Sequence, residues 1–478
     1  MKKRNIYFLA SEAMPYIKVG GLGDVAGTLP LAIRSLSDNL DVRLVLPFHS
    51  DIRRQDFDLQ WLCSFNIPTK DSLMPVEIFT THLEEVPVYF VDGPPIRVDA
   101  SVYSADDAKD VYKYTFFSLA ALGLLKCLEW SPHVIHANDW HTALAIYAVG
   151  LNRITDSFYR HTTTLLTVHN LPFLGGHARD ALQTFGLPPA EGSSLPAWAQ
   201  DMPLPLGLLM ADYIIAVSPT YAKDILTPEY GSGLDEFLST RRESLIGILN
   251  GLDVDYWNPL TDPYLTKNYC IETLNQRVKN KISLQAECNL QVDERIPLFA
   301  MISRFDYQKG VDLAVEALRM LDHQPWQVVF LGKGDPTLEQ VVTQFQGENP
   351  ENVKVFLKYD EPLSHRIYSA ADMILIPSRY EPCGLVQMIA MRYGCVPIGR
   401  ATGGLKDTIQ DYSQHEKGVG FLFEDAAPLF LKEAIIRALV IYNDPTQWIK
   451  LQRRGMEMDF SWQRSAEQYL EIYLKLIR

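Results

Sequence analysis

The fold is decided by residues 377–404, which read PSRYEPCGLVQMIAMRYGCVPIGRATGG. The apolar residues just before them, 373–376, are typical of a buried parallel strand, and Pro377 ends that strand because it has no N–H to give to the ladder. Glu381 then lies in the strand-to-helix loop, and Gly384 is expected to open a helix whose first amides point back at the loop. Ligands of open α/β sheets bind at such strand ends, so these amides can hold hydroxyls or phosphates.

A second glycine pair, Gly403 and Gly404, repeats this arrangement one strand later. The spacing alone does not distinguish a ligand site from an ordinary surface loop of an α/β domain in which Glu381 is solvated. The rest of the chain has to decide between the two interpretations.

Composition limits the classes of protein that fit this sequence. A chain of 478 residues is too long for one usual core, so two or three domains are expected. The fractions of 47% hydrophobic and 21% charged residues are those of a soluble globular protein. The formal charge of −14 argues against a nucleic-acid or anionic-membrane surface, so any phosphate must be held by a local pocket.

The cysteines and the apolar segments indicate a cytoplasmic protein. Six scattered cysteines form no C-x-x-C pair and have no histidine at zinc spacing, which favours reduced thiols. Cys383 lies beside Glu381 and remains open as a nucleophile, although no histidine is near it in the sequence. The N-terminal apolar run is interrupted too early for a signal peptide, and the run at 114–125 is too short to cross a bilayer, so no membrane contact is expected.

The first half opens with a β-loop-α-β unit. Strands are expected at 5–11 and 41–46, and between them lie the glycine loop KVGGLGD at 18–24 and a helical pattern. The glycines have one residue too many for the dinucleotide fingerprint, which argues against a nicotinamide site. A lysine and free amides at a helix N-terminus suit a diphosphate, and a tight turn with a solvated Lys18 is the alternative.

Histidines gather at two further strand ends of this half. A strand at 133–137 leads into Asn138-Asp139-Trp140-His141, and a strand at 164–168 leads into His169. They indicate a site, unless they are helix caps or packed core residues. No metal-binding spacing is present, so no metal is expected. A strand at 212–217, an irregular region at 188–205 and a crossover between domains at 245–259 complete this half.

The second half repeats the α/β alternation, which predicts a parallel sheet with helices on both faces. Its strands are expected at 297–302, 327–331, 353–357, 373–376 and 396–398, with a helix at 311–321. The terminal segment 460–478 is an amphipathic helix that must bury one face. The residues of that face are Ala466, Tyr469, Leu470, Tyr473, Leu474 and Ile477.

Two cations follow the first strand of the second half. Arg304 and Lys309 are five residues apart in the turn SRFDYQKG, and both can converge on one anion. A solvated basic loop is the alternative. The position of Glu381 at the same expected sheet edge favours a site.

Eight motifs occur in an order that resembles one family. They are KVGGLGD, HANDWH, TVHN, GILNGLD, SRFDYQKG, LGKGD, KYDEPLSHRIYSAAD and EPCGL. The sequence resembles bacterial glycogen synthases and plant starch synthases, which are retaining glucosyltransferases of the GT-B type. Ile389 stands where the wider superfamily has a second glutamate, which the glycogen synthase branch also lacks. Residues 51–111 and 173–205 match less well, and this bears on the acceptor more than on the donor.

The resemblance implies a GT-B fold, in which two Rossmann-like, doubly wound α/β domains face each other across a cleft. The N-terminal, acceptor-side domain is expected at 1–248, the nucleotide-sugar-binding domain at 249–458, and a C-terminal helix at 459–478 that returns to the first domain.

The resemblance also implies roles for residues of the second domain. Arg304 and Lys309 would hold the diphosphate of a nucleotide-glucose and neutralise charge as the nucleoside diphosphate leaves. Glu381 would hydrogen-bond the donor sugar, and Tyr359 would stack on the nucleoside base. Backbone amides around three residues would bind the sugar as well, namely those of Cys383, Gly384 and Leu385.

In the first domain, His141 would contact the glucose and present its carbonyl to the anomeric carbon. The glycine loop would meet the diphosphate, supported by an aspartate, and an asparagine would line the donor side. The substrate-binding residues implied there are Lys18, Gly20, Gly21, Asp24, Asp139 and Asn250.

The function implied is transfer of glucose from ADP-glucose to the non-reducing end of an α-1,4-glucan, either glycogen or maltodextrin, with retention of configuration. No carboxylate in these motifs pairs with Glu381 as in retaining glycosidases, so a front-face transfer without cofactor or metal is expected. The alternatives are a GT-B enzyme with another donor such as UDP-glucose or another acceptor, and a non-catalytic glucan-binding regulator.

Overall fold

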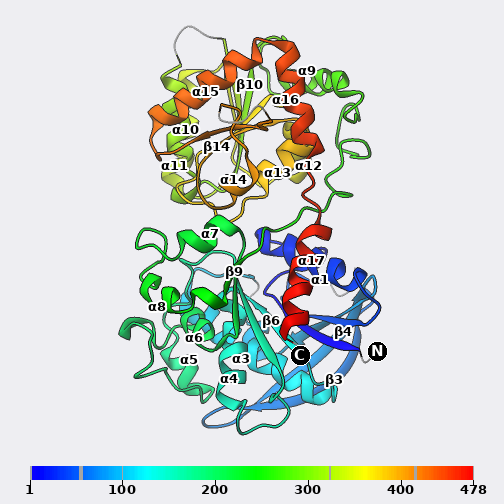
Figure 1. The fold of residues 1–478 in the computed structure, drawn as a ribbon, viewed down its shortest axis with the longest axis vertical. Coiled ribbons are helices and arrows are strands. Elements are labelled where there is room, and N and C mark those ends of the chain that lie inside the picture. Colours follow the sequence, from blue (N-terminus) through cyan, green and yellow to red (C-terminus); the bar gives the residue numbers. More distant parts are fainter. Residues whose placement is uncertain (1–2, 53–56, 99–100, 322–324, 414–416, 477–478) are drawn as a thin grey trace. The chain divides into compact units, whose positions relative to one another are not determined.

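The computed structural model describes residues 3–52, 57–98, 101–321, 325–413 and 417–476. The chain forms two compact units (Figure 1). The first unit contains residues 1–251 and 462–478, and the second contains residues 252–461. The predicted functional domains, 1–248 and 249–458 with a separate terminal helix, stay a prediction.

The first unit is built on a mixed sheet. Nine strands are described in it, in the order β3-β4-β5-β2-β1-β6-β7-β8-β9. β3, β4 and β5 pair antiparallel, and all the other neighbours pair parallel. The strands are β1 (Arg4–Leu9), β2 (Leu40–Pro47), β3 (Gln60–Pro68), β4 (Leu73–Leu83), β5 (Val86–Asp92), β6 (Val134–Asn138), β7 (Thr163–Val168), β8 (Tyr213–Ala216) and β9 (Leu245–Gly247).

Nine α-helices are described in this unit. They are α1 (Gly21–Ser35), α2 (Pro94–Arg97), α3 (Asp107–Cys127), α4 (Asp139–Asn152), α5 (Arg179–Thr184), α6 (Pro203–Met210), α7 (Pro219–Asp224), α8 (Asp235–Thr240) and α17 (Trp462–Leu476), with short 3₁₀ turns at Ala197–Ala199 and Arg242–Ser244. β1 is followed in sequence by its neighbour β2 on one side, whereas β6 lies on its other side. The strand order therefore reverses between β1 and β6, which is where doubly wound sheets place ligands.

The second unit carries a parallel sheet in the order β12-β11-β10-β13-β14-β15. Its strands are β10 (Leu298–Ile302), β11 (Gln327–Leu331), β12 (Val353–Phe356), β13 (Met373–Ile376), β14 (Val396–Arg400) and β15 (Phe421–Phe423). Its helices are α9 (Arg277–Glu287), α10 (Val311–Arg319), α11 (Pro336–Glu348), α12 (Glu361–Ala370), α13 (Val386–Arg392), α14 (Gly403–Thr408), α15 (Pro428–Tyr442) and α16 (Pro445–Glu457), with 3₁₀ turns at Leu274–Gln276 and Tyr307–Lys309. Here the order reverses between β10 and β13.

The predicted doubly wound α/β class is confirmed. β11 and β13 have the predicted bounds, and most other predicted strands differ from the observed ones by one or two residues at an end. The prediction missed β3, β4 and β5, which lie in a stretch that had been assigned no structure, and the three-residue strands β9 and β15. β3 and β4 are antiparallel and partly exposed, and β9 and β15 have only three residues, so these four lack the long apolar run by which buried parallel strands are recognised. β5 does have such a run, and it pairs parallel with β2, so its omission has no such reason.

The return of the C-terminal helix to the first unit is also confirmed. Figure 1 shows α17, in red, alongside α1, in blue, and Ala466, Tyr469 and Tyr473 of α17 are fully buried in the core of this unit. Leu474 was predicted on the buried face, but it is 41% exposed. Ile472 is buried instead, because the helix turns by 3.6 residues and the buried stripe drifts along it. The predicted Ile477 lies outside the described residues.

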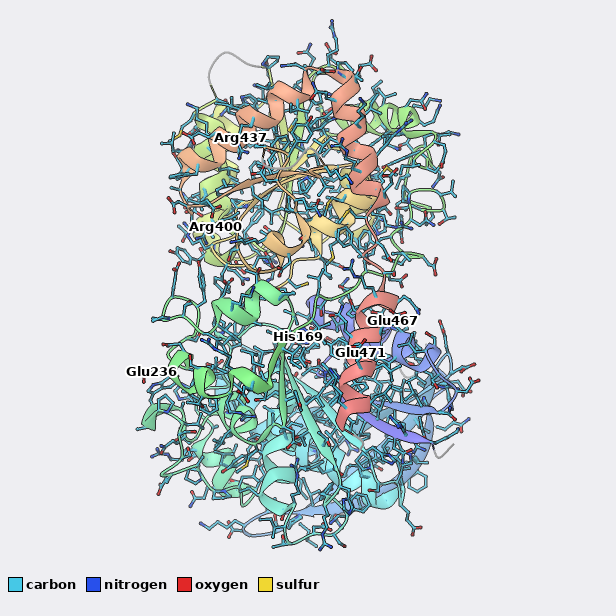
Figure 2. The ribbon with its side chains drawn as sticks, in the orientation of Figure 1. His169, Glu236, Arg400, Arg437, Glu467 and Glu471 are labelled. Carbon is cyan, nitrogen blue, oxygen red and sulfur yellow. The ribbon has the colours of Figure 1, made fainter. Side chains whose placement is uncertain are left out.

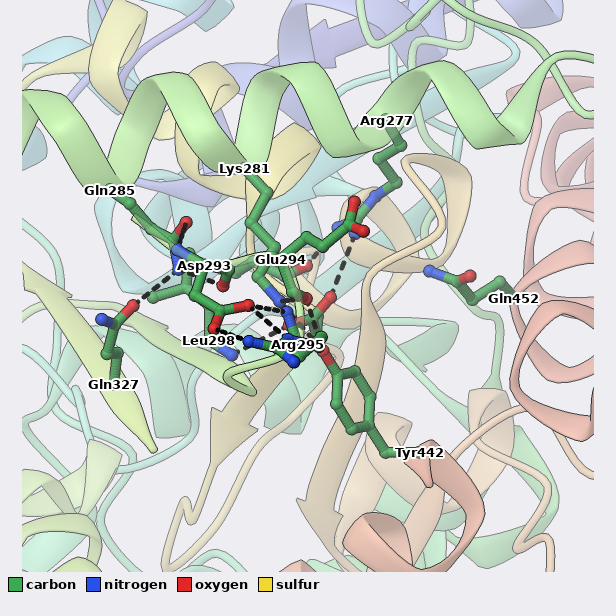
Figure 3. Close-up of polar contacts among 12 residues, drawn as sticks. Arg277, Lys281, Gln285, Asp293, Glu294, Arg295, Leu298, Gln327, Tyr442 and Gln452 are labelled. Carbon is green, nitrogen blue, oxygen red and sulfur yellow. Dashed lines mark hydrogen bonds and ion pairs between the residues drawn. The ribbon is translucent and has the colours of Figure 1, made fainter. Parts of the chain in front are cut away.

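A buried polar network joins α9 to the amino ends of the strands in the second unit (Figure 3). Asp372, just before β13, accepts hydrogen bonds from Lys281 Nζ at 2.7 Å and from Leu298 N at 2.9 Å, and Arg277 approaches it to 3.8 Å. Lys281 Nζ also donates to Tyr442 Oη at 2.9 Å. The network is therefore at the end of the sheet opposite to the carboxyl ends, where ligands bind.

Candidate active site

In the second unit, a cation and a carboxylate meet at the point where the strand order reverses. Lys309 follows β10, Glu381 follows β13, and Lys309 Nζ donates to both carboxylate oxygens of Glu381, at 2.8 and 2.7 Å. Ser378 Oγ donates to the same carboxylate at 2.8 Å. Glu381 is 6% exposed. Glu381 is therefore not solvated in a surface loop, which was the alternative interpretation of the sequence. Its carboxylate is buried and hydrogen-bonded to Lys309 and Ser378.

Backbone contacts hold the two loops of this cluster together. Arg379 N donates to Gln308 O at 2.7 Å, and the Gln308 side chain donates to Tyr380 O at 3.2 Å. These bonds fix the loop after β10 against the loop after β13. The distance between Lys309 and Glu381 is therefore set by the backbone as well as by charge.

The glycine pair at Gly403 and Gly404 has a packing role that the sequence did not predict. A Cβ at Gly403 would lie 2.0 Å from Glu381 O, and a Cβ at Gly404 would lie 2.0 Å from Cys383 O. Gly404 N donates to Glu381 O at 3.0 Å. Only glycine allows this close approach, so the pair supports the loop that carries Glu381.

The helix after this loop starts later than predicted. Gly384 has a φ of 73° and lies outside α13, which begins at Val386 with Leu385 as its N-cap. The positive φ turns the chain before the helix, and so glycine is needed there. The Gln387 side chain donates to Cys383 O at 3.0 Å and to Gly384 O at 2.8 Å, which fixes the turn. Cys383 is buried.

Arg304 and Tyr359 are the other side chains of the second unit for which a role was predicted. Arg304 pairs with Asp306 at 3.3 Å, and the Arg304 side chain is 60% exposed. Asp306 in turn caps the turn that carries Lys309, because its carboxylate accepts from Lys309 N at 3.0 Å. Tyr359 follows β12, two positions from β10 in the sheet, and is exposed. The convergence of Arg304 and Lys309 on one anion stays a prediction.

In the first unit, the glycine loop after β1 is held by Glu12, for which the sequence predicted no role in the site. The buried carboxylate of Glu12 accepts hydrogen bonds from Val19 N, from Gly20 N at 3.0 Å and from Tyr103 Oη at 2.9 Å. Burial raises the pKa of Glu12. The sequence itself shows only an acid between the first strand and the glycine loop, and nothing in it marks that acid as buried.

This arrangement changes the interpretation of the loop. Lys18 pairs with Asp24 at 2.7 Å, as expected for a supporting aspartate. The amides of Val19 and Gly20 already serve Glu12, so the prediction that the free amides of this loop bind an anion does not apply to them. The alternative of a solvated lysine in a plain turn is also wrong, because Lys18 is ion-paired and the loop is fixed.

Asp139 and His141 lie at the neighbouring strand end, after β6. Asp139 has a φ of 56°, and its Oδ1 accepts from His169 N at 2.7 Å and from Asn170 N at 3.4 Å. A non-glycine residue in this region of φ is strained, and such strain gathers at functional sites. Asn138 Nδ2 donates to Leu9 O at 2.9 Å, which ties this strand end to that of β1.

His141 is packed among aromatic rings. Its ring centroid lies 4.1 Å from Trp140, 4.6 Å from Tyr114 and 4.8 Å from Tyr103. Burial lowers the pKa of His141 well below its usual range, so the imidazole is neutral. Its Nδ1 is buried and has no hydrogen-bond partner among the described residues, and its carbonyl accepts from Ser118 Oγ at 3.4 Å. The role of this carbonyl at the anomeric carbon stays a prediction.

Three other polar residues near these strand ends are buried or half-buried, namely His136, His169 and Asn250. His136 is a core residue, because its ring bonds Tyr473 Oη and Thr167 Oγ1, both at 2.7 Å. His169, at the end of β7 (Figure 2), lies 2.9 Å from Asn138 Oδ1, and burial lowers the pKa of both histidines to about 3. Asn250 is buried, and its Oδ1 has no partner among the described residues.

Asp139 gives a pH-dependent prediction. Burial, with the nearby charge of Glu12, raises the pKa of Asp139 to about 7, whereas an unfolded aspartate ionises near pH 4. Its contribution to the free energy of unfolding is therefore fully present below about pH 4 and is lost as the pH rises to about 7. We expect the melting temperature of Asp139→Asn, relative to that of the native protein, to increase between about pH 5 and pH 8. A difference that stays constant over this range would contradict the raised pKa.

The described residues contain neither a metal-ligand cluster nor a membrane-spanning helix. No group of three or more metal-ligating side chains is placed to hold an ion within the part of the chain that the structure describes. No helix in that part is long and apolar enough to cross a membrane.

Comparisons with known proteins place this geometry in context. A family model described as starch synthase catalytic domain matches residues 5–240, and one described as glycosyl transferases group 1 matches residues 288–454. The chain is 38% identical over 482 residues to a glycogen synthase of Syntrophotalea carbinolica, covering 99% of each chain. It is 37% identical over 478 residues to a glycogen synthase of Clostridium perfringens, covering 99% of this chain and 98% of the relative.

Two solved structures are similar to this chain over nearly its whole length. The catalytic domain of starch synthase IV from Arabidopsis thaliana, bound to ADP and acarbose, is 32% identical, covers 100% of both chains and has a TM-score of 0.90. A sucrose-phosphate synthase from Thermosynechococcus elongatus has a TM-score of 0.64 at 19% identity, covers 99% of both chains and supports the fold alone.

Proposed function

Because the chain belongs to the glycogen and starch synthase family of glucosyltransferases with the GT-B fold, we propose that it uses ADP-glucose as donor. It extends an α-1,4-glucan at its non-reducing end with retention of configuration. Glycogen or maltodextrin is the acceptor, and the cytoplasm is the place of reaction, in keeping with cysteines that are all free thiols.

The observation that carries this proposal is the contact between Lys309 and Glu381. A nucleotide sugar has a diphosphate and a sugar joined at one reacting bond. Lys309 supplies a compact cation for the diphosphate, and Glu381 supplies acceptors for the sugar hydroxyls beside it. Arg304, on the same loop as Lys309, is proposed to hold the diphosphate with its planar fork once the donor draws it from Asp306.

The reaction needs charge stabilisation more than proton transfer by the protein. As the bond from the anomeric carbon to the phosphate oxygen breaks, positive charge grows on the sugar and negative charge grows on the diphosphate. Lys309 and Arg304 stabilise the departing diphosphate, which accepts the proton of the acceptor hydroxyl on the same face of the sugar. The neutral, buried His141 is proposed to bind the glucose without adding a repelling charge.

In the first unit, Lys18 is proposed to bind phosphate, and Glu12 keeps the loop in its bound shape. Exchange of the Asp24 carboxylate for a phosphate at Lys18 needs only the movement of an aspartate that is 29% exposed in its side chain. The bonds from Val19 and Gly20 to Glu12 remain in place during that exchange.

The direct test is transfer of labelled glucose from ADP-glucose, and separately from UDP-glucose, to glycogen and to a short maltodextrin without added metal. We expect incorporation from ADP-glucose that exceeds incorporation from UDP-glucose, and no effect of a chelator, because Lys309 and Arg304 are the cations that meet the diphosphate. Preference for UDP-glucose would overturn the donor. Binding of glucan by folded protein without transfer from either donor would overturn the enzymatic role.

A further inference from the structure

Two cysteines of the first unit lie in contact although they are far apart in the sequence. Cys63 is on β3, the outermost described strand of the sheet, and Cys127 is the last residue of α3. The Cys63 and Cys127 thiols lie near enough to interact electrostatically. The proposed glucosyl transfer uses neither residue.

The packing of α3 on β3 explains why these two thiols meet. A Cβ on Gly123 of α3 would lie 2.5 Å from the Phe65 ring of β3, so helix and strand touch at this pair. Cys63 lies two residues before Phe65 on the same face of the strand, about 6.6 Å away along it. Cys127 lies four residues after Gly123 on the same face of the helix, about 6 Å away along it. The two steps match in length, so if helix and strand run in opposite directions here, Cys127 meets Cys63 one step beyond the first contact, as the interaction between their thiols requires.

The register of the strand supports this placement. Cys63 pairs with Ile78 of β4, and Phe65 pairs with Val76, and both β4 partners are fully buried. Directly opposed residues of an antiparallel pair lie on one face of a sheet, so the Cys63 side chain points to the covered face. The register shifts between Trp61 and Cys63, and such an irregularity re-aims the next side chain.

Access differs between the two thiols in a way that assigns their chemical roles. Cys127 is exposed and Cys63 is half-buried. Burial, with the neighbouring thiol of Cys127, raises the pKa of Cys63 to about 12. Cys127 is therefore the thiol that a reagent in solution meets first, and Cys63 is held next to it as a thiol that can displace the reagent. By contrast, Cys288, Cys383 and Cys395 are buried.

We propose that Cys63 and Cys127 form a thiol pair that is converted reversibly to an intramolecular disulfide by a small-molecule disulfide such as oxidised glutathione. The Cys127 thiolate attacks one sulfur of the reagent, which forms a mixed disulfide and releases one reduced thiol. Cys63 then loses its proton to solvent and attacks Cys127 Sγ, which forms the protein disulfide and releases the second reduced thiol. The protein loses two electrons and two protons, and the reagent gains both.

The disulfide would join the outermost strand of the sheet to the helix that packs on α4, the helix of Asp139 and His141. It closes a loop between positions 63 and 127, and loops of this length restrict the unfolded chain strongly. Oxidation is therefore expected to stabilise the first unit. This inference does not depend on the proposed function, because its measurements need no substrate.

The test uses the full chain incubated with oxidised glutathione, then unfolded, alkylated and weighed by mass spectrometry. Of the six cysteines, we expect two to escape alkylation in the oxidised protein, with Cys63 and Cys127 found in one linked pair of peptides. Dithiothreitol should restore all six alkylations. The melting temperature should rise on oxidation and fall again on reduction.

Single variants separate the steps. Cys63→Ser should stop at a glutathione adduct on Cys127, and Cys127→Ser should show neither the adduct nor the disulfide at these positions. Cys270→Ser, at a cysteine whose neighbour is Thr273, is the matched control and should form the disulfide as the native protein does. Alkylation of all six cysteines after treatment, or a stable glutathione adduct on Cys127 in the native protein, would overturn the proposal.

Discussion

Replacing Lys309 by alanine is expected to lower kcat/KM for glucosyl transfer by about 10²- to 10³-fold, the usual loss when one preorganised donor to a developing negative charge is removed. Lys309 is the cation that touches both oxygens of Glu381 and that is proposed to stabilise the departing diphosphate. Because this charge develops during the reaction, kcat should fall more than KM rises. Initial rates measured over a range of ADP-glucose concentrations separate the two constants.

The matched control is Lys450→Ala, which removes an exposed lysine of α16 and should leave the rate unchanged. The melting temperature of Lys309→Ala must also be measured, since the substitution leaves the buried Glu381 with Ser378 as its remaining side-chain donor among the described residues. A folded Lys309→Ala with near-native kcat/KM would show that the pair with Glu381 is structural only.

The largest loss of stability is expected from Asp372→Asn, which should lower the free energy of unfolding by about 3–5 kcal/mol, as for other buried ion pairs that lose one partner. Asp372 is the buried carboxylate that faces Lys281 and Arg277. Asparagine keeps the shape but leaves two buried cations without a negative charge. Hydrogen exchange of the β10 and β13 amides under native conditions measures this loss within the second unit. These amides should exchange faster in Asp372→Asn than in the native protein.

Asp293→Asn is the control for this effect. Asp293 pairs with Arg295, whose side chain is 85% exposed, so solvent screens the interaction. The exchange of the β10 and β13 amides should therefore hardly change in this variant. Equal protection in Asp372→Asn and Asp293→Asn would show that the buried network does not hold this end of the sheet.

Much of the fold could be predicted because parallel strands that are buried on both faces leave a continuous apolar run. Residues 327–331 and 373–376 are such runs, and their strands have the predicted bounds. Once these strands were predicted, the loops after them could be placed at the carboxyl edge of the sheet, where ligands bind. β3 was missed because it is half-exposed, and its identity depends on pairing with β4 rather than on its own pattern.

The site was predicted less completely, because its decisive contacts join distant residues. Lys309 and Glu381 were both chosen from the sequence, but their direct contact arises only because β10 and β13 are neighbours in the sheet. Glu12 was missed because a buried acid is recognised by its partners, here the amides of Val19 and Gly20. The glycines at 403 and 404 were correctly noticed, but their role depends on a carbonyl that a Cβ would displace.

The position of α17 has a consequence for the order in which the chain matures on the ribosome. Residues 252–461 are continuous, so the second unit has all of its residues once the chain has been translated and released to 461. The first unit, although most of it is synthesised earlier, lacks Tyr469 and Tyr473 until α17 emerges, and until then His136 lacks the Tyr473 phenol to which it bonds. The half of the protein that is made first is therefore the half that is completed last.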